Sequence, residues 1–139
     1  MIAYLDSSVI LRAVLGEPGR LREWPRLEQG ITSALAEVEC LRTLDRLALR
    51  GVLDAEEVAE RRAAVYELLE AVELVELGAP VLARAAQPFP TPLGTLDALH
   101  LATALLWREQ GERGLVFATH DVALGLAARA SGFEVLGAA

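Results

Sequence analysis

Short apolar runs alternate with longer amphipathic stretches along most of this chain. Runs suited to buried strands occur at residues 2–5, 30–33, 72–77, 115–118 and 133–136. Between them lie segments with the apolar spacing of helices, at residues 7–15, 34–50, 55–70, 81–86, 95–110 and 122–130. Strands that alternate with helices form a mostly parallel sheet with helices on both faces. The pattern predicts an α/β fold, a three-layer sandwich around a central sheet of about five strands.

Capping and turn residues mark the ends of several predicted helices. Ser7 and Ser8 are expected to cap the first helix, and Asp54 the third. Gly16 and Gly51 each follow a helical segment and are expected to end it. Three of the 6 prolines lie in residues 87–92, which predicts an extended segment before the next helix.

Two of the predicted helices have a clear inward face. In residues 34–50, apolar residues recur every three positions, at Leu35, Val38, Leu41, Leu44 and Leu47. In residues 55–70, the inward residues are expected to be Val58, Ala59, Val65, Leu68 and Leu69.

Composition places these elements in one domain. The chain has 139 residues, 53% of them hydrophobic, with a mean hydropathy of +0.34, which suits a single packed domain over residues 1–139. Its apolar stretches are shorter than the roughly 18 residues of a membrane span, and the segment MIAYLDSS lacks a basic leader. We therefore expect a cytoplasmic protein without membrane contact. Cys40 is the only cysteine, which excludes an intramolecular disulfide and a cysteine-rich zinc site.

Charge restricts how the chain can bind nucleic acid. The net charge is −7, which argues against binding by general electrostatic attraction to phosphates. All 13 basic residues are arginine, and lysine is absent. Any nucleic-acid activity must then depend on local patches or on bound cations.

Four acidic residues occupy positions that suit a catalytic centre. Asp6 and Asp121 each follow an apolar strand, where active sites of parallel sheets gather. Asp97 lies in the first turn of an apolar helix, where burial of an unpaired carboxylate would be costly without a cation. Glu39 lies on an amphipathic helix, followed by Arg42 and Arg46 at positions that could contact phosphates.

Each acid also has a purely structural interpretation. Asp6 and Asp121 can cap the helices that follow them, and Asp97 can interact with the dipole of its own helix. Glu39 can form a surface ion pair with Arg42. His100 is expected to be a hydrogen-bonded packing residue and His120 a surface residue, because no His-Glu-x-x-His zinc spacing occurs. We expect Trp24 and Trp107 to anchor the core or an interface.

Four segments together resemble a PIN domain, most closely the VapC-type toxins of prokaryotic toxin–antitoxin pairs. These segments are residues 4–8, 33–42, 96–104 and 118–121, and the resemblance extends over essentially the whole chain. It implies a PIN-like fold and a catalytic set formed by Asp6, Glu39, Asp97 and Asp121. Glu39 rather than Glu37 matches the family glutamate by its interval from Ser33.

The resemblance also implies an activity and partners. It implies a Mg²⁺- or Mn²⁺-dependent endoribonuclease that is usually a homodimer and is inhibited by a cognate antitoxin. The metal would be held by Asp6, Asp97 and Asp121, with Ser7, Ser8 and Thr119 as supporting hydroxyls, and oxygen ligands suit these ions. Arg12, Arg42 and Arg46 are candidate RNA contacts. We also expect a hydrophobic groove for the antitoxin, lined by the helices around residues 11–24 and 34–49.

Three alternatives compete with the toxin interpretation. A PIN-like RNA-processing nuclease outside a toxin pair would have the same site. A non-catalytic RNA- or protein-binding module would share the fold but would not need four mutually repelling acids. Phospho-aspartate enzymes and signalling receivers also place an aspartate after the first strand. Both of these families need a lysine near the phosphate, and this chain has none.

Overall fold

The central strand of the sheet, β1 (Ile2–Leu5), comes from the first apolar run of the chain. The computed structural model describes residues 1–138. It contains a five-stranded sheet in the order β3-β2-β1-β4-β5, in which every neighbouring pair is parallel. The other strands are β2 (Gln29–Ser33), β3 (Glu73–Val75), β4 (Val116–Ala118) and β5 (Val135–Leu136). The predicted α/β class and the five-stranded, mostly parallel sheet are confirmed.

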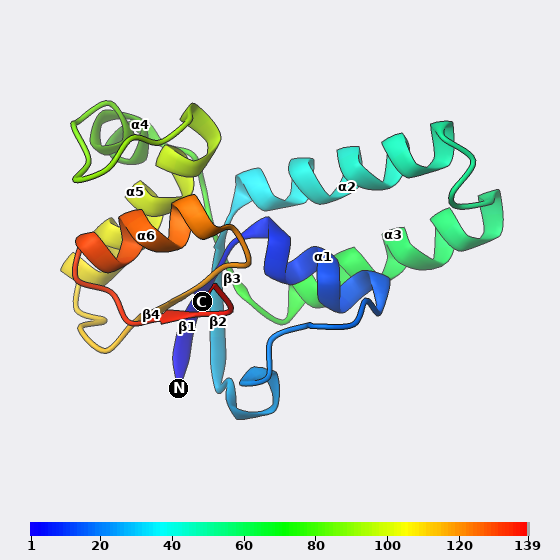
Figure 1. Ribbon diagram of the computed structural model, residues 1–139, viewed down its shortest axis with the longest axis horizontal. Coiled ribbons are helices and arrows are strands. Elements are labelled where there is room, and N and C mark those ends of the chain that lie inside the picture. Colours follow the sequence, from blue (N-terminus) through cyan, green and yellow to red (C-terminus); the bar gives the residue numbers. More distant parts are fainter. Residues whose placement is uncertain (139) are drawn as a thin grey trace.

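Within residues 1–138 there are six α-helices, which flank the sheet or, in the case of α4, pack on a neighbouring helix (Figure 1). They are α1 (Ser7–Leu15), α2 (Ala34–Leu49), α3 (Ala55–Glu70), α4 (Ala79–Ala85), α5 (Thr95–Glu109) and α6 (Val122–Ala130). A single 3₁₀ turn, η1 (Trp24–Arg26), precedes β2. None of the helices within residues 1–138 is both long and apolar enough to cross a membrane.

Alternation along β1 divides the core into two layers. Ala3 and Leu5 face a cluster of buried residues from α1, α2 and α3. Tyr4 faces the opposite cluster, which includes residues of α5 and α6. Because successive strand residues point to opposite faces, a fully buried β1 needs a helical layer on each side. The three-layer arrangement follows directly. Trp24 and Trp107 pack at the margins of these two clusters, as expected for anchors.

The helices α2 and α3 form a long antiparallel hairpin that extends beyond the sheet (Figure 1). Gly51 lies in the turn between them with a φ of 74°, in the left-handed region that favours glycine. Asp54 caps α3 through a capping box with Glu57, in agreement with the predicted cap. The predicted end of α1 is also confirmed, because Gly16 closes it with a φ of 65°.

The predicted inward faces of α2 and α3 are partly wrong. The buried residues of α2 are Ala36, Cys40 and Leu44, which lie four positions apart, and Val38 is 57% exposed. An α-helix has 3.6 residues per turn, so residues spaced strictly by three move progressively around the helix axis. Val38 therefore lies on the outer face of α2. In α3, Ala59 is exposed, whereas Val65 and Leu69 are buried as predicted.

Candidate active site

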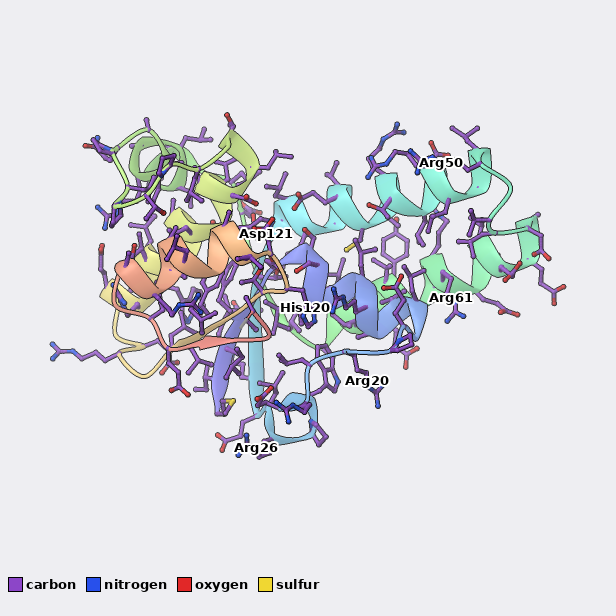
Figure 2. All side chains as sticks on the ribbon, in the orientation of Figure 1. Arg20, Arg26, Arg50, Arg61, His120 and Asp121 are labelled. Carbon is purple, nitrogen blue, oxygen red and sulfur yellow. The ribbon has the colours of Figure 1, made fainter. Side chains whose placement is uncertain are left out.

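The four candidate acids all lie at the carboxyl edge of the sheet. Asp6 follows β1 directly, and Asp121 comes shortly after β4, the neighbour of β1. Glu39 lies in α2, which starts at the end of β2, and Asp97 lies in the first turn of α5. Figure 2 shows Asp121 at the start of α6, with His120 beside it toward α1. The parallel sheet thus brings four distant stretches of chain to one place.

Asp6 is buried, at 4% exposure, and both of its carboxylate oxygens accept hydrogen bonds. One oxygen, Oδ1, accepts hydrogen bonds from Ser8 Oγ at 2.5 Å and from the Val9 backbone N–H at 3.2 Å. The other, Oδ2, accepts one from Thr119 Oγ1 at 2.5 Å. Asp6, rather than Ser7 or Ser8, therefore caps α1, which corrects the predicted cap. Burial raises the pKa of Asp6, and the hydroxyls of Ser8 and Thr119 partly oppose this.

Two side chains contact the same carboxylate oxygen of Glu39. Its Oε1 accepts a hydrogen bond from Ser7 Oγ at 2.9 Å and lies 2.5 Å from Nε2 of His100. His100 is buried at 1% exposure and contacts the Tyr4 hydroxyl through Nδ1 at 2.6 Å. The prediction of His100 as a hydrogen-bonded packing residue is confirmed. Its link to Glu39 was not foreseen, because 61 residues separate the two along the chain.

Asp97 shows that the four acids share one electrostatic environment. The pKa of its carboxyl is raised, first by burial and then by the negative charges of Asp121 and Asp6, with a smaller effect of Glu39. No donor within residues 1–138 gives its carboxylate a hydrogen bond. The residue before α5, Gly94, is its N-cap and has no side chain to cap the helix. A carboxylate in this position gains most from a nearby cation.

Asp121 and Asp6 are joined through one hydroxyl. Thr119 Oγ1 donates to Asp6 and accepts the backbone N–H of Asp121 at 3.0 Å. Asp121 caps α6 through Oδ1, which accepts from the Leu124 backbone N–H at 2.9 Å. The capping interpretation of Asp6 and Asp121 therefore holds, and both residues still border the same centre.

The donor set suits a hydrated divalent cation better than a closed metal cage. Within residues 1–138, no three His, Cys, Asp or Glu side chains stand close enough to enclose a metal ion. No arginine of that same stretch lies within ion-pair distance of any of the four acids. Mg²⁺ keeps several waters and needs only one or two direct carboxylates. A cluster of carboxylates without arginine partners therefore fits such an ion in chemistry and in charge.

Comparisons with known proteins identify the family. A profile described as "PIN domain" matches residues 3–128. This chain belongs to the PIN domain family. The protein named Ribonuclease VapC47, from Mycobacterium tuberculosis (strain CDC 1551 / Oshkosh), is 32% identical over 138 residues, or 94% of this chain and 92% of the relative. Ribonuclease VapC46, from M. tuberculosis (strain ATCC 25618 / H37Rv), is 38% identical over 104 residues, or 73% of this chain and 72% of the relative.

Solved structures share the PIN fold of this chain at low sequence identity. The structure of FitAB bound to an IR36 DNA fragment superposes with a TM-score of 0.68 and 20% identity, over 97% of this chain and 93% of that one. M. tuberculosis VapC20, described as a Sarcin-Ricin loop cleaving toxin, gives a TM-score of 0.63 and 17% identity, over 96% and 98%. At this level of identity, these likenesses support the fold alone.

The candidate RNA-contacting arginines of this PIN domain lie around the site rather than in it. Arg42 is exposed and forms an ion pair with Asp45 at 3.1 Å. Arg46 is exposed and donates to Thr43 Oγ1 at 3.0 Å. Arg12 is half-buried, and its guanidinium donates to the backbone carbonyl of Gly19.

His120 differs from the surface residue that was predicted. It is half-buried, and its ring lies against Gly137, where a Cβ would come within 3.2 Å of Nδ1. Burial, followed by the positive charge of Arg12, lowers the pKa of His120. The ring is therefore mostly neutral at pH 7.

The groove expected between residues 11–24 and 34–49 does not take the predicted form. Helix α1 packs directly on α2, and the hollow bordered by residues 19–23 is lined by polar side chains, including Arg20, Arg22 and Glu23. A more apolar cavity of about 780 Å³ lies between α4, the proline-rich segment and α5, where Leu82, Phe89 and Leu99 contribute to its walls.

Proposed function

We propose that this PIN domain is a Mg²⁺- or Mn²⁺-dependent endoribonuclease that hydrolyses RNA phosphodiester bonds. The observation that carries the proposal is the environment of Asp97. Its carboxylate lies at the same edge of the sheet as Asp6 and Asp121, without an arginine partner in residues 1–138, and burial followed by the charges of these neighbours raises its pKa. Both curated relatives described above bear the name ribonuclease, which supports the same activity.

We propose that Asp6, Asp97 and Asp121 hold the metal, one or two of them directly and the rest through its bound waters. When bound, such an ion orients the phosphodiester, activates a water and offsets the charge that develops on the phosphate. The chain itself fixes the positions of the carboxylates. Thr119 ties Asp6 to the start of α6, and Ser8 holds Asp6 Oδ1 while its own oxygen accepts the backbone N–H of His120 at 2.9 Å. These hydroxyls set the geometry before any substrate arrives.

Glu39 is the residue we expect to orient the attacking water. Its two hydrogen bonds both go to Oε1, so Oε2 faces no donor within residues 1–138. A carboxylate oxygen in this position can accept a hydrogen bond from the attacking water. It can then take the proton of that water as the P–O bond to the leaving oxygen breaks. Arg12, Arg42 and Arg46 are proposed to contact RNA phosphates outside this centre.

We also propose that the protein is the toxin of a type II toxin–antitoxin pair, a cytoplasmic homodimer with a cognate antitoxin. The solved structures with the same fold include VapBC-1 from nontypeable Haemophilus influenzae and a toxin–antitoxin complex from Klebsiella pneumoniae. Exposed apolar side chains on α2, such as Val38 and Leu49, provide surface that a partner could cover. Growth arrest on expression, relieved by co-expression of a small neighbouring open reading frame, tests this role. Harmless expression would instead favour an RNA-processing nuclease.

A cleavage assay tests the proposed activity. Purified protein is incubated with total RNA, transfer RNA and ribosomal RNA fragments in Mg²⁺ or Mn²⁺, and products are mapped by primer extension. We expect discrete internal cuts that stop with EDTA and with Asp6→Asn. Glu37→Gln, which neutralises another acid of α2, should cleave as the wild type does. Intact RNA under all of these conditions, with binding retained, would identify a non-catalytic binding module.

A further inference from the structure

A buried chain of hydrogen bonds connects the core of the molecule to Glu39. It runs from the hydroxyl of Tyr4 on β1 to Nδ1 of His100 on α5 at 2.6 Å, and from Nε2 of His100 to Oε1 of Glu39 at 2.5 Å. Tyr4 is 0% exposed and His100 is 1% exposed, while Glu39 reaches the centre from α2. Three separate elements thus meet at one carboxylate.

The direction of these hydrogen bonds follows from what each group can donate. A neutral imidazole carries one N–H and one acceptor nitrogen, and an ionised carboxylate only accepts. If Nε2 lacked its hydrogen, two lone pairs would face each other across the short contact with Glu39. Nε2 must therefore donate to Glu39.

The Tyr4 hydroxyl selects this form of the ring. A tyrosine hydroxyl keeps its proton at neutral pH, because its unperturbed pKa is about 10. It donates that proton to Nδ1, and Nδ1 then acts as the acceptor. The hydrogen of the ring is left at Nε2, toward Glu39.

The core fixes the position of Tyr4 and hence of the imidazole. The Tyr4 ring stacks on Phe117 of β4, with centroids 5.1 Å apart and an interplanar angle of 20°. It meets the imidazole of His100 edge-on, at 5.8 Å and 69°. These aromatic contacts add to the hydrogen bond in fixing the orientation of the imidazole.

We propose that Tyr4 and His100 are positioning residues, which hold Oε1 of Glu39 through the Nε2–H tautomer of His100 and thereby direct Oε2 to the reacting water. Ser7 supplies the second fixed contact on Oε1, at 2.9 Å. This inference rests on the proposed nuclease function for its catalytic consequence. Its structural part, the tautomer, does not depend on that function.

The tautomer is tested directly by long-range ¹H–¹⁵N NMR correlation on protein labelled at histidine nitrogen. The signals of His100 are assigned with a His120→Gln variant. We expect a protonated Nε2 and an unprotonated Nδ1 in the wild type, and a shifted Nδ1 signal in Tyr4→Phe. An unprotonated Nε2, a doubly protonated ring, or an unchanged Nδ1 signal in Tyr4→Phe would overturn the proposal. This result is obtained whether or not the protein cleaves RNA.

The catalytic consequence is tested by kinetics with a matched pair of variants. His100→Leu removes the donor, whereas the side-chain amide of His100→Gln can still donate to Glu39. We expect His100→Leu to lower kcat by about tenfold or more with little change in KM, as for the loss of other supporting hydrogen bonds to catalytic groups. His100→Gln should recover at least part of this loss, and Tyr4→Phe should give a smaller decrease.

Leu105→Val controls for simple destabilisation, because Leu105 is buried on the same helix in the Tyr4 cluster and is remote from Glu39 in sequence and in its contacts. Its kcat should remain near the wild-type value at a temperature where all variants are folded. Equal kcat for His100→Leu and His100→Gln, or a decrease in Leu105→Val that matches theirs, would overturn the positioning role. A wild type that cleaves no RNA would instead remove the proposed nuclease function and leave the NMR result intact.

Discussion

The two halves of the acidic centre are held in different ways. The inner half consists of Asp6 and Glu39, whose carboxylates accept hydrogen bonds from side chains of three other elements or loops. The outer half consists of Asp97 and Asp121, at the starts of α5 and α6. Asp97 receives no side-chain hydrogen bond within residues 1–138, and Asp121 accepts one backbone N–H.

This difference indicates what each half requires. The inner half is organised by the protein, because burial of Asp6 is offset by hydroxyl donors. In the outer half, no donor within residues 1–138 gives the Asp97 carboxylate a hydrogen bond. Burial raises the pKa of Asp97, and the neighbouring acids raise it further. The outer half is therefore where a cation should contribute most to stability, and the inner half is where the chain has already fixed the geometry.

Neutralising one acid in each half gives the largest expected effect. Asp6→Asn and Asp97→Asn should each lower the rate of RNA cleavage by about 100-fold or more, because several kcal/mol of charge stabilisation is lost. Thermal unfolding in EDTA should separate the two variants. Asp6→Asn should lower Tm, because both of its oxygens accept hydrogen bonds, whereas Asp97→Asn should leave Tm unchanged or raise it. The opposite ranking of Tm would contradict the assignment of the two halves.

Divalent cations should stabilise the wild type and not a variant of the outer half. At a concentration about 100 times the Kd, bound Mg²⁺ or Mn²⁺ adds about 2.7 kcal/mol to the free energy of unfolding. We expect Asp97→Asn to lose most of this gain, since Asp97 lacks another source of compensation. Chemical denaturation at several Mn²⁺ concentrations measures it, with Ca²⁺-free buffer and Glu37→Gln as controls. An identical gain in Asp97→Asn would place the cation elsewhere.

Removing the hydroxyl that joins the halves should have an intermediate effect. Thr119→Val leaves Asp6 Oδ2 and the backbone N–H of Asp121 without their partner, which should cost about 1–3 kcal/mol of stability. Cleavage should fall by about tenfold, because the carboxylates lose their mutual placement. Thr32→Val is the control, since Thr32 is a buried hydroxyl that donates to the carbonyl of Leu5 at 2.6 Å. Similar activity in the two variants would show that Thr119 acts only through stability.

The smallest effect concerns pH. The folded-state pKa of Asp97 lies above its unfolded value, so the folded protein binds this proton more tightly. Its contribution to stability is complete below the unfolded pKa and is lost as pH rises through the folded pKa, with a slope of at most about 1.4 kcal/mol per pH unit. In EDTA, the difference in unfolding free energy between the wild type and Asp97→Asn should follow this course. A difference that is constant with pH would contradict the raised pKa.

Much of the fold could be predicted from local pattern. Every predicted strand and helix exists, and Gly16, Gly51 and Asp54 mark helix ends as expected. These features depend on near neighbours in the sequence, such as glycine in a left-handed turn or a capping side chain. The predicted inward position of Val38 was wrong because the rotation of α2 is set by the layers that it packs against.

The sequence indicated the four acids and the nearby hydroxyls of Ser7, Ser8 and Thr119, but not the histidine that contacts Glu39. Acids after strands in a parallel sheet converge by topology, which the alternating pattern already implies. The connection from Tyr4 through His100 to Glu39 spans 96 residues, and no local pattern indicates it. The half-buried state of His120 likewise depends on Gly137, a distant turn. Contacts of this kind are determined by tertiary packing.

Anomalous diffraction from crystals soaked in Mn²⁺ tests the central claim most directly. We expect an anomalous peak within coordination distance of oxygens of Asp6, Asp97 or Asp121, with remaining ligand positions filled by water, and no such peak in Asp97→Asn. An anomalous peak that lies away from all four acids, or none at Mn²⁺ concentrations that support RNA cleavage, would contradict it.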